Sequence, residues 1–207
     1  MSRCLIISAA PIENYEPLLV YMNNIDYIIC ADGGYNHAKN LGLKPNIIIG
    51  DLDSIGELPK DIETLRFNKE KDDTDTMLAV KYGIEKGFKD FLLIGAMGGR
   101  LDHTYANFCT LHYIIKNGCT GFIADNFSEV HIMEKGEIKF KRQENYYISV
   151  FSFGAKSACV SEKGFKYSLD SFLLKSENPI GVSNEFKDDI ATITVENGTI
   201  IIILAKK

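Results

Sequence analysis

The sequence has no apolar stretch that approaches the ~20 residues needed to span a bilayer. The N-terminal apolar run at residues 4–8 is also too short for the core of a signal peptide, and it predicts a first β-strand instead. These two absences argue against a membrane protein.

The cysteines lack the spacing of a zinc knuckle or of a disulfide framework. There are five of them, an odd number, and the sequence has no C-x-x-C pair. Reduced thiols of this kind are typical of cytoplasmic proteins. The cysteine pattern therefore predicts a cytoplasmic location.

An excess of positive charge is lacking as well. The formal net charge is -5, whereas a non-specific nucleic-acid binder needs a basic surface to neutralise phosphates. Hydrophobic residues make up 45% of the 207 residues, enough to build a buried core. We therefore expect one large or two modest domains and no nucleic-acid partner.

Residues 1–125 alternate between strand-like and helix-like segments. Continuous apolar runs, typical of parallel strands buried on both faces, occur at residues 4–8, 27–31, 46–50, 91–95 and 121–124. Helical patterns occur at residues 35–41, 74–86 and 102–116, the first two followed by glycine and the third by Asn117 and Gly118. This alternation predicts a Rossmann-like α/β domain with a parallel sheet.

Residues 126–207 have a different pattern, dominated by short β-type stretches. These stretches lie at residues 130–133, 138–140, 146–153, 190–195 and 200–204. Residues 196–199 (ENGT) predict a hairpin turn between the last two of them. We expect a C-terminal antiparallel β-sandwich.

Two aspartates one residue apart follow the apolar run at residues 46–50. Asp51 and Asp53 therefore stand beyond the carboxyl end of a predicted parallel strand, where open α/β sheets bind their ligands. Magnesium prefers oxygen ligands, so this pair is suited to bracket a divalent cation. The alternative is a solvated turn that carries acidic residues.

Three carboxylates precede the next predicted helix. They belong to Asp72, Asp73 and Asp75. Asp73 or Thr74 is suited to cap that helix, and acidic residues complement its dipole. Capping does not account for all three, because clustered carboxylates repel one another unless a cation holds them. Lys71 is expected to neutralise part of this charge or to reach a phosphate.

A glycine-rich turn joins the strand at residues 91–95 to the following helix. It contains Gly98, Gly99 and Arg100, and Asp102 and His103 come next. Glycines allow close approach of a phosphate, a helix N-terminus favours negative charge, and an arginine fork fits phosphate oxygens. His103 has packing or capping as its alternative role, and Asn107 is expected on the same helix face.

A fourth loop, with Asp32, Gly33 and Gly34, follows the strand at residues 27–31. A plain turn is the alternative for this loop taken alone. All four loops would leave carboxyl ends of strands, so together they predict a magnesium–nucleotide site. The sequence has neither a G-x-x-x-x-G-K-[ST] loop nor the glycine loop and H-R-D signature of protein kinases, which excludes those classes.

These motifs, in this order and spacing, resemble thiamine pyrophosphokinase. The matching segments are residues 31–34 (ADGG), 50–54 (GDLDS), 72–75 (DDTD) and 98–103 (GGRLDH). Residues 181–185 (GVSNE) resemble the family's thiamine-contacting segment, and the resemblance covers the whole chain. It implies an α/β catalytic domain at 1–125, a thiamine-binding β-sandwich at 126–207, and a homodimer with active sites between subunits.

The resemblance also implies roles for individual residues. Magnesium and the ATP phosphates would be held by Asp51, Asp53 and Asp75. Arg100 and Asp102 would orient phosphate and nucleotide, at a site completed by Asp32, Gly33, Gly34, Asp72, Thr74, Gly98, Gly99 and His103. Ser183 and Asn184 would line the thiamine pocket. Tyr167, where the family often has tryptophan, would offer an aromatic face to the thiazolium, with a place in the sandwich core as its alternative.

The implied reaction is transfer of a diphosphate from ATP to the thiamine hydroxyl, with release of AMP. Asp53 or Asp75 is the candidate to accept the hydroxyl proton. Three alternatives remain open: a haloacid dehalogenase-type phosphatase with Asp51 as nucleophile, a non-catalytic thiamine or nucleotide sensor, and transfer to another alcohol such as a pterin. An acyl-phosphate on Asp51 would favour the first alternative, and binding without turnover would favour the second.

Overall fold

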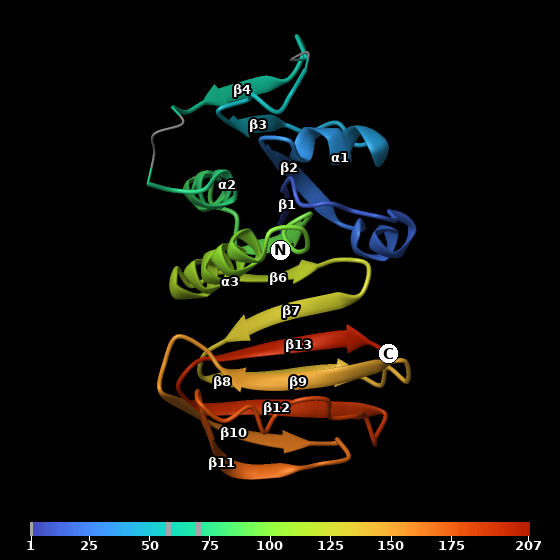
Figure 1. Ribbon diagram of the computed structural model, residues 1–207, viewed down its shortest axis with the longest axis vertical. Helices are drawn as coiled ribbons and strands as arrows, with labels where there is room; N and C mark the ends of the chain where they lie inside the picture. The colour runs from blue at the N-terminus through green and yellow to red at the C-terminus, as the bar shows by residue number, and fades with distance from the viewer. Residues whose placement is uncertain (1, 57–58, 69–71) are drawn as a thin grey trace. The chain divides into compact units, whose positions relative to one another are not determined.

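The computed structural model describes residues 2–56, 59–68 and 72–207 of the chain. The chain divides into two compact units, Met1–Asn126 and Phe127–Lys207. Figure 1 colours the first unit from blue through green to yellow at β6 and the second from yellow to red. Among the described residues, no helix is long and apolar enough to cross a membrane.

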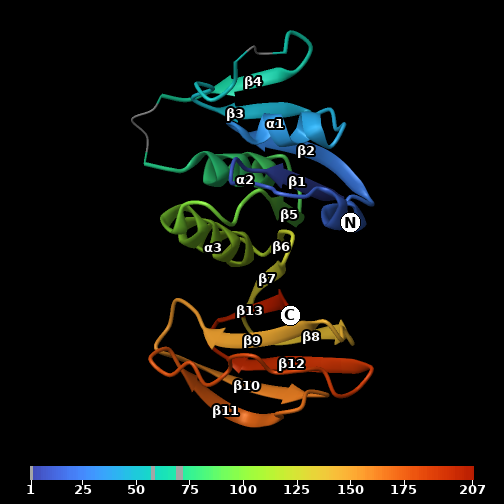
Figure 2. The same cartoon turned by 45° about the vertical axis from the view of Figure 1, so that its right-hand side comes forward.

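The first unit is built on a parallel sheet with the strand order β4-β3-β2-β1-β5-β6. Its strands are β1 (Arg3–Ile7), β2 (Ile25–Ala31), β3 (Ile47–Gly50), β4 (Glu63–Arg66), β5 (Asp90–Ile94) and β6 (Thr120–Ala124). All five adjacent pairs run parallel. The chain first adds strands on one side of β1 and then returns to its other side with β5, so the order reverses between β1 and β5 (Figure 2).

Helices cover both faces of this sheet. They are α1 (Gly34–Asn40), α2 (Asp75–Glu85) and α3 (Leu101–Lys116), with a short 3₁₀ helix, η1 (Glu16–Tyr21), before β2. Ala38 of α1 packs with Leu5 and Ile7 on one face of β1. Gly83 of α2 lies against Cys4 on the opposite face. Strand side chains alternate between faces, so β1 is buried on both sides, as its continuous apolar sequence predicts.

The second unit is an antiparallel β-sandwich. One sheet contains β7 (Ser128–Met133), β13 (Ile200–Lys206) and β9 (Tyr146–Ser152), and the other contains β11 (Leu169–Lys175), β10 (Ser157–Lys163), β12 (Ile190–Asn197) and β8 (Gly136–Lys141). Side chains from both sheets form one core, to which Ile148, Val160 and Ile202 contribute. The predicted fold class, a parallel α/β layer with an antiparallel sandwich, is confirmed.

The predicted hairpin at residues 196–199 is wrong. Strand β12 pairs with β10 and β8, whereas β13 pairs with β7 and β9. The turn therefore carries the chain from one sheet of the sandwich to the other. Gly198 (φ +88) lies so close to the neighbouring backbone that a Cβ would come within 2.8 Å of the carbonyl oxygen of Ser157. The turn sequence predicted the reversal correctly, but it does not specify which strands become partners.

Candidate active site

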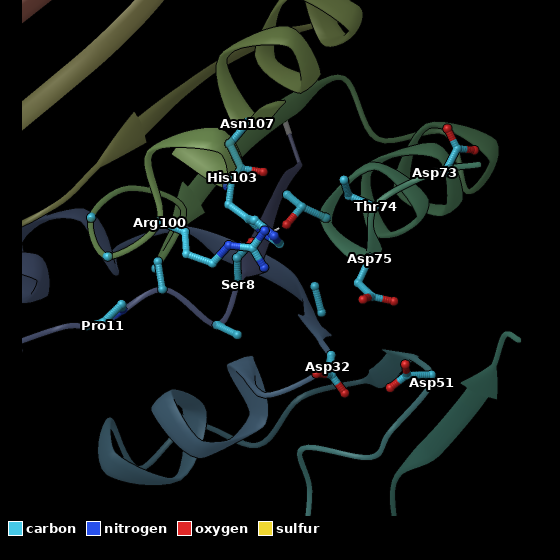
Figure 3. Close-up of a pocket in the computed structure, with 17 residues that line it drawn as sticks. Ser8, Pro11, Asp32, Asp51, Asp73, Thr74, Asp75, Arg100, His103 and Asn107 are labelled. Carbon is cyan, nitrogen blue, oxygen red and sulfur yellow. Dashed lines mark hydrogen bonds between the residues drawn. The ribbon is translucent and has the colours of Figure 1, made fainter. Parts of the chain in front are cut away.

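A cavity of about 560 Å³ lies at the carboxyl ends of the central parallel strands. Its walls come from the segments that follow β1, β2, β3 and β5 and from the first turns of α2 and α3 (Figure 3). The strand order reverses between β1 and β5, and open α/β sheets bind ligands at this kind of position. All four loops singled out in the sequence contribute to the cavity, with Asp32, Asp51, Thr74, Asp75, Gly98, Gly99, Arg100 and His103 among its lining residues.

Three carboxylates form a cluster, of which Asp32 and Asp51 line the cavity and the exposed Asp53 lies beside them. Asp32, Asp51 and Asp53 each place an oxygen atom within 4.8 Å of the other two. Asp53 also donates its backbone N–H to Asp51 Oδ1 at 3.2 Å. Sequence reasoning assigned Asp32 to the nucleotide and not to the metal, yet the structure places it with the pair after β3. Asp75 also lines the cavity, and its side chain points from the start of α2 toward Asp32 and Asp51 (Figure 3).

The environment of Asp32 fits a cation. Its Oδ2 accepts a short hydrogen bond from Ser54 Oγ, whereas its buried Oδ1 has no hydrogen-bond partner in the described part of the chain. The residue also has a left-handed backbone (φ +46). A buried carboxylate oxygen without a donor is costly, and grouped carboxylates repel one another. Hard divalent cations such as magnesium relieve both, because they bind through oxygen ligands.

The first turn of α2 separates the acidic residues that precede it. Thr74 is the N-cap, and its hydroxyl accepts a hydrogen bond from the N–H of Met77 at 3.2 Å. Asp73 forms an ion pair with Lys81 of α2 at 2.5 Å, so this lysine neutralises one of the three carboxylates. Asp75 points into the cavity (Figure 3).

One acidic residue of this motif does not line the cavity. Asp72 is exposed and is absent from its wall. Lys71 lies outside the described residues. Of the Asp72–Asp75 motif, Asp73, Thr74 and Asp75 thus line the cavity.

The glycine-rich turn leads directly into α3. Gly98 (φ +90) and Gly99 (φ +64) both have left-handed backbones, which favour glycine. Arg100 is the N-cap residue of α3, and its side chain extends toward the middle of the residues that line the cavity (Figure 3). The turn and the helix N-terminus therefore present backbone N–H groups and a positive dipole end to the cavity.

Arg100 is held by Asp102. Its Nε donates to Asp102 Oδ1 at 3.1 Å and its Nη2 to Oδ2 at 2.5 Å. This pairing raises the pKa of the guanidinium and lowers the pKa of the Asp102 carboxyl. Asp102 does not line the cavity itself, so it acts on the cavity through Arg100. Both side chains are exposed, which leaves the pair free to open toward an incoming anion.

His103 and Asn107 lie on one face of α3, as predicted, and both line the cavity. Asn107 is buried and donates its side-chain N–H to the carbonyl of Ala96 at 2.7 Å, which fixes the strand-to-helix turn. Sequence reasoning missed Ser8 and Thr76. Their hydroxyls bond to each other at 2.8 Å in the buried part of the cavity wall. Ser8 directly follows β1, so the strand-end rule that found the other loops also applies to it.

Gly33 and Gly34 do not line the cavity, but they shape the loop that does. A Cβ on Gly34 would stand 1.9 Å from the carbonyl oxygen of Ile7. Glycine is therefore required for α1 to start this close to β1. The close approach brings Asp32 and the segment after β1 into one wall.

The predicted thiamine residues lie in the sandwich. Tyr167 is 64% exposed, so its alternative role as a core residue is wrong. Ser183 is exposed and has a left-handed backbone (φ +58). Asn184 is buried, and its amide bonds to the backbone of Tyr167 in both directions.

Sequence reasoning also missed Glu162, an acidic side chain that is only 2% exposed. It accepts a hydrogen bond from Asn184 Nδ2 at 3.0 Å. Burial raises its pKa to about 7. Its alternation with Ala158 and Val160, both in the core, was the one sequence signal of its position.

Comparisons with known proteins agree on one family. Residues 18–123 match the model for the thiamin pyrophosphokinase catalytic domain, and residues 135–200 match the model for the thiamin pyrophosphokinase vitamin B1 binding domain. The thiamine pyrophosphokinase of Bacillus subtilis (strain 168) is 27% identical over 205 residues, covering 96% of each chain. Thiamine pyrophosphokinase 1 of Oryza sativa subsp. japonica is 26% identical over 203 residues, covering 83% of this chain and 76% of its own.

Solved structures show the same fold. The crystal structure of the Bacillus subtilis thiamine pyrophosphokinase superposes with a TM-score of 0.90 at 25% identity, over all of both chains. The thiamin pyrophosphokinase of Candida albicans superposes with a TM-score of 0.79 at 17% identity, over all of this chain and 89% of its own. Both domain models match in order along the sequence, and the first spans half of it. The chain belongs to the thiamine pyrophosphokinase family of enzymes.

Proposed function

We propose that this enzyme transfers the diphosphate of ATP to the hydroxyl of thiamine, forming thiamine diphosphate and AMP. The observation that carries the proposal is that a carboxylate cluster and a glycine-rich helix N-terminus border the same cavity. A cation site opposite an anion site is what a polyphosphate substrate requires. Family membership decides against the phosphatase alternative raised by the Asp-x-Asp spacing.

We assign the magnesium site to Asp51, Asp53 and Asp75, and we add Asp32 because its oxygen atoms lie with those of the first two. When bound, magnesium would neutralise negative charge on the phosphate oxygens. Ser54 keeps Asp32 oriented toward the cluster through its hydroxyl.

The anionic half of ATP is assigned to the opposite wall. Backbone N–H groups at Gly98 and Gly99 would bind phosphate oxygens, and Arg100 would exchange part of its contact with Asp102 for a phosphate. His103 and Thr74 border the same space. Gly33 and Gly34 would shape the nucleotide pocket by letting α1 start close to β1, whereas Asp72, which is exposed and outside the cavity wall, receives no role.

Thiamine is assigned to the exposed residues of the sandwich. Tyr167 offers an aromatic face to the thiazolium cation, and Ser183 offers a hydroxyl beside it. The amide of Asn184 is buried and bonded within the chain, so we assign it to holding these two residues in place.

In the reaction, the hydroxyl oxygen of thiamine forms a bond to the β-phosphorus of ATP. The bond between that phosphorus and the oxygen bridging to the α-phosphate breaks, and AMP leaves with the electron pair. The hydroxyl proton passes to a carboxylate oxygen of Asp53 or Asp75. The enzyme contributes mainly by positioning and by charge neutralisation, because phosphoryl transfer needs little covalent chemistry from the protein.

We further propose a cytoplasmic homodimer with active sites between subunits. The sandwich exposes large apolar side chains that a second subunit would cover, among them Leu173, Ile180 and Val182. Mixing an inactive Asp53→Asn variant with an inactive Tyr167→Ala variant tests this assignment. Recovered activity in the mixture would support sites built from two subunits, and its absence would place each site within one chain.

The reaction itself is tested by incubating the protein with thiamine, ATP and magnesium and separating the products by chromatography. We expect thiamine diphosphate and AMP in equal amounts, both abolished by EDTA. The Asp53→Asn variant should lose this turnover, whereas Asp61→Asn, at an exposed aspartate paired with Lys44, should retain it. Formation of ADP would indicate transfer of a single phosphate, and normal turnover by Asp53→Asn would refute the metal assignment.

A further inference from the structure

Glu162 is an acidic side chain inside the β-sandwich. It lies on β10 with the same alternation as Ala158 and Val160, two residues of the core. Its Oε2 accepts a hydrogen bond from Asn184 Nδ2, and its buried Oε1 has no hydrogen-bond partner within the described chain. Burying a carboxyl group costs free energy unless its oxygens are hydrogen-bonded, and only one oxygen of Glu162 is, so the group calls for an explanation.

Asn184 connects Glu162 to the exposed residues assigned to thiamine. Its Nδ2 donates both to Glu162 Oε2 and to the carbonyl of Tyr167, the latter at 2.7 Å. Its Oδ1 accepts from the N–H of Tyr167 at 3.0 Å and from the N–H of Glu185 at 2.9 Å. The side-chain amide of Asn184 therefore joins the Tyr167 segment to the Ser183–Glu185 segment, and it is also hydrogen-bonded to the buried Glu162.

The Ser183 side of this arrangement is held in the same way. The N–H of Ser183 donates to Ser149 Oγ at 3.0 Å, and Asn184 pairs through its backbone with Ile148 of β9. Ser183 and Tyr167 are thus exposed residues whose backbones are held by a buried hydrogen-bonded network. Glu162 comes from the sheet opposite to β9, so this network spans the interior of the sandwich.

We propose that Glu162 is a positioning residue for thiamine, acting through Asn184 on Tyr167 and Ser183. The inference rests on the proposed thiamine-binding role of those two exposed residues. An ionised carboxylate is a stronger hydrogen-bond acceptor than either a protonated carboxyl group or the neutral amide of glutamine. The hold on Asn184, and with it the affinity for the aromatic cation, should strengthen when Glu162 is ionised.

The surroundings leave Glu162 free to titrate by itself. Leu169 of β11 and Ile193 of β12, its partners in strand register, are uncharged. Burial raises the pKa of Glu162 to about 7, and the hydrogen bond from Asn184 opposes that rise. The other titratable side chains on β10, β11, β12 and the two segments that Asn184 joins are Cys159, Lys163, Lys166, Tyr167, Asp170, Lys175, Glu185 and Glu196. None of these eight forms a hydrogen bond or an ion pair with Glu162 among the contacts that the structure describes.

The test compares Glu162→Gln with Glu196→Gln in the full-length enzyme. Glu196 is a carboxylate of the same sandwich, and it accepts hydrogen bonds from Cys159, Ser161 and Ser171 without contacting Asn184. We expect Glu162→Gln to raise the KM for thiamine about fivefold at pH 8, the step expected when a charge-assisted hydrogen bond becomes a neutral one. The KM for ATP should stay within about twofold, and the control should change neither.

The pH profile separates positioning from a purely structural role. In the wild-type enzyme the KM for thiamine should fall as the pH rises through about 7, and this step should vanish in Glu162→Gln. A variant with reduced thermal stability but an unchanged KM for thiamine at every pH would overturn the inference. An equal rise in both KM values would overturn it too.

Direct binding of thiamine, measured by calorimetry, keeps this inference distinct from the proposed reaction. Wild-type protein that binds thiamine without forming AMP would refute the reaction, and a weaker thiamine affinity of Glu162→Gln would still support positioning. Wild-type protein that binds no thiamine would overturn both.

Discussion

Replacing Glu162 by glutamine should remove a pH dependence from the stability of the enzyme. Burial holds the pKa of this carboxyl at about 7 in the folded state, against an ordinary value of 4.5. The folded protein therefore binds the proton more tightly than the unfolded chain does, and the free energy of unfolding falls as the pH rises from 4.5 toward 7. The full effect amounts to about 3 kcal/mol, of which about 2.5 kcal/mol is lost between pH 5 and pH 8.

Urea unfolding of the wild type and of Glu162→Gln at several pH values measures this effect. Only the difference between the two proteins is used, because other groups also titrate. The stability of the wild type relative to the variant should decrease by about 2.5 kcal/mol from pH 5 to pH 8. A Glu196→Gln control should show a constant difference in this range, because its hydrogen bonds lower the pKa of Glu196 and move its titration to more acidic pH. Parallel curves for wild type and Glu162→Gln would refute the reasoning.

Three further changes follow from the catalytic unit. Thr74→Ala removes the N-cap of α2 and should lower the free energy of unfolding by about 1 kcal/mol in urea titrations, and an unchanged value would contradict the capping role. Gly34→Ala places a methyl group 1.9 Å from the carbonyl oxygen of Ile7 and should destabilise the fold by about 3 kcal/mol or more, whereas Gly56→Ala, in open space, should have little effect. Millimolar magnesium should raise the melting temperature of the wild type but not of Asp32→Asn, and an equal shift in both would place the cation elsewhere.

The elements that the sequence predicted best are those whose burial leaves a pattern. Strands β1, β3 and β5 are buried along most of their length, so their apolar runs stand out. Strand β4 was missed, because all four of its residues are exposed at the sheet edge. The pairing of β12 was predicted wrongly, since a turn sequence carries no information about which sheet each strand joins.

The candidate site was predictable to the extent that its residues follow strands. Asp51 and Arg100 lie where the strand-end rule places them. The rule could not show that Asp73 is neutralised by Lys81 or that Asp32 joins the acidic cluster, because both depend on distances between separate loops. Glu162 gave no functional signal at all, since a single glutamate in a strand is ordinarily a surface residue.

The amide of Asn184 limits how this enzyme can be redesigned. Its nitrogen donates two hydrogen bonds and its oxygen accepts two, which is the full hydrogen-bonding capacity of an asparagine side chain. Aspartate lacks the donors, and glutamine carries the same groups one methylene further out. A library that aims to exchange thiamine for another aromatic cation should therefore keep position 184 fixed and vary the exposed neighbours Tyr167 and Ser183.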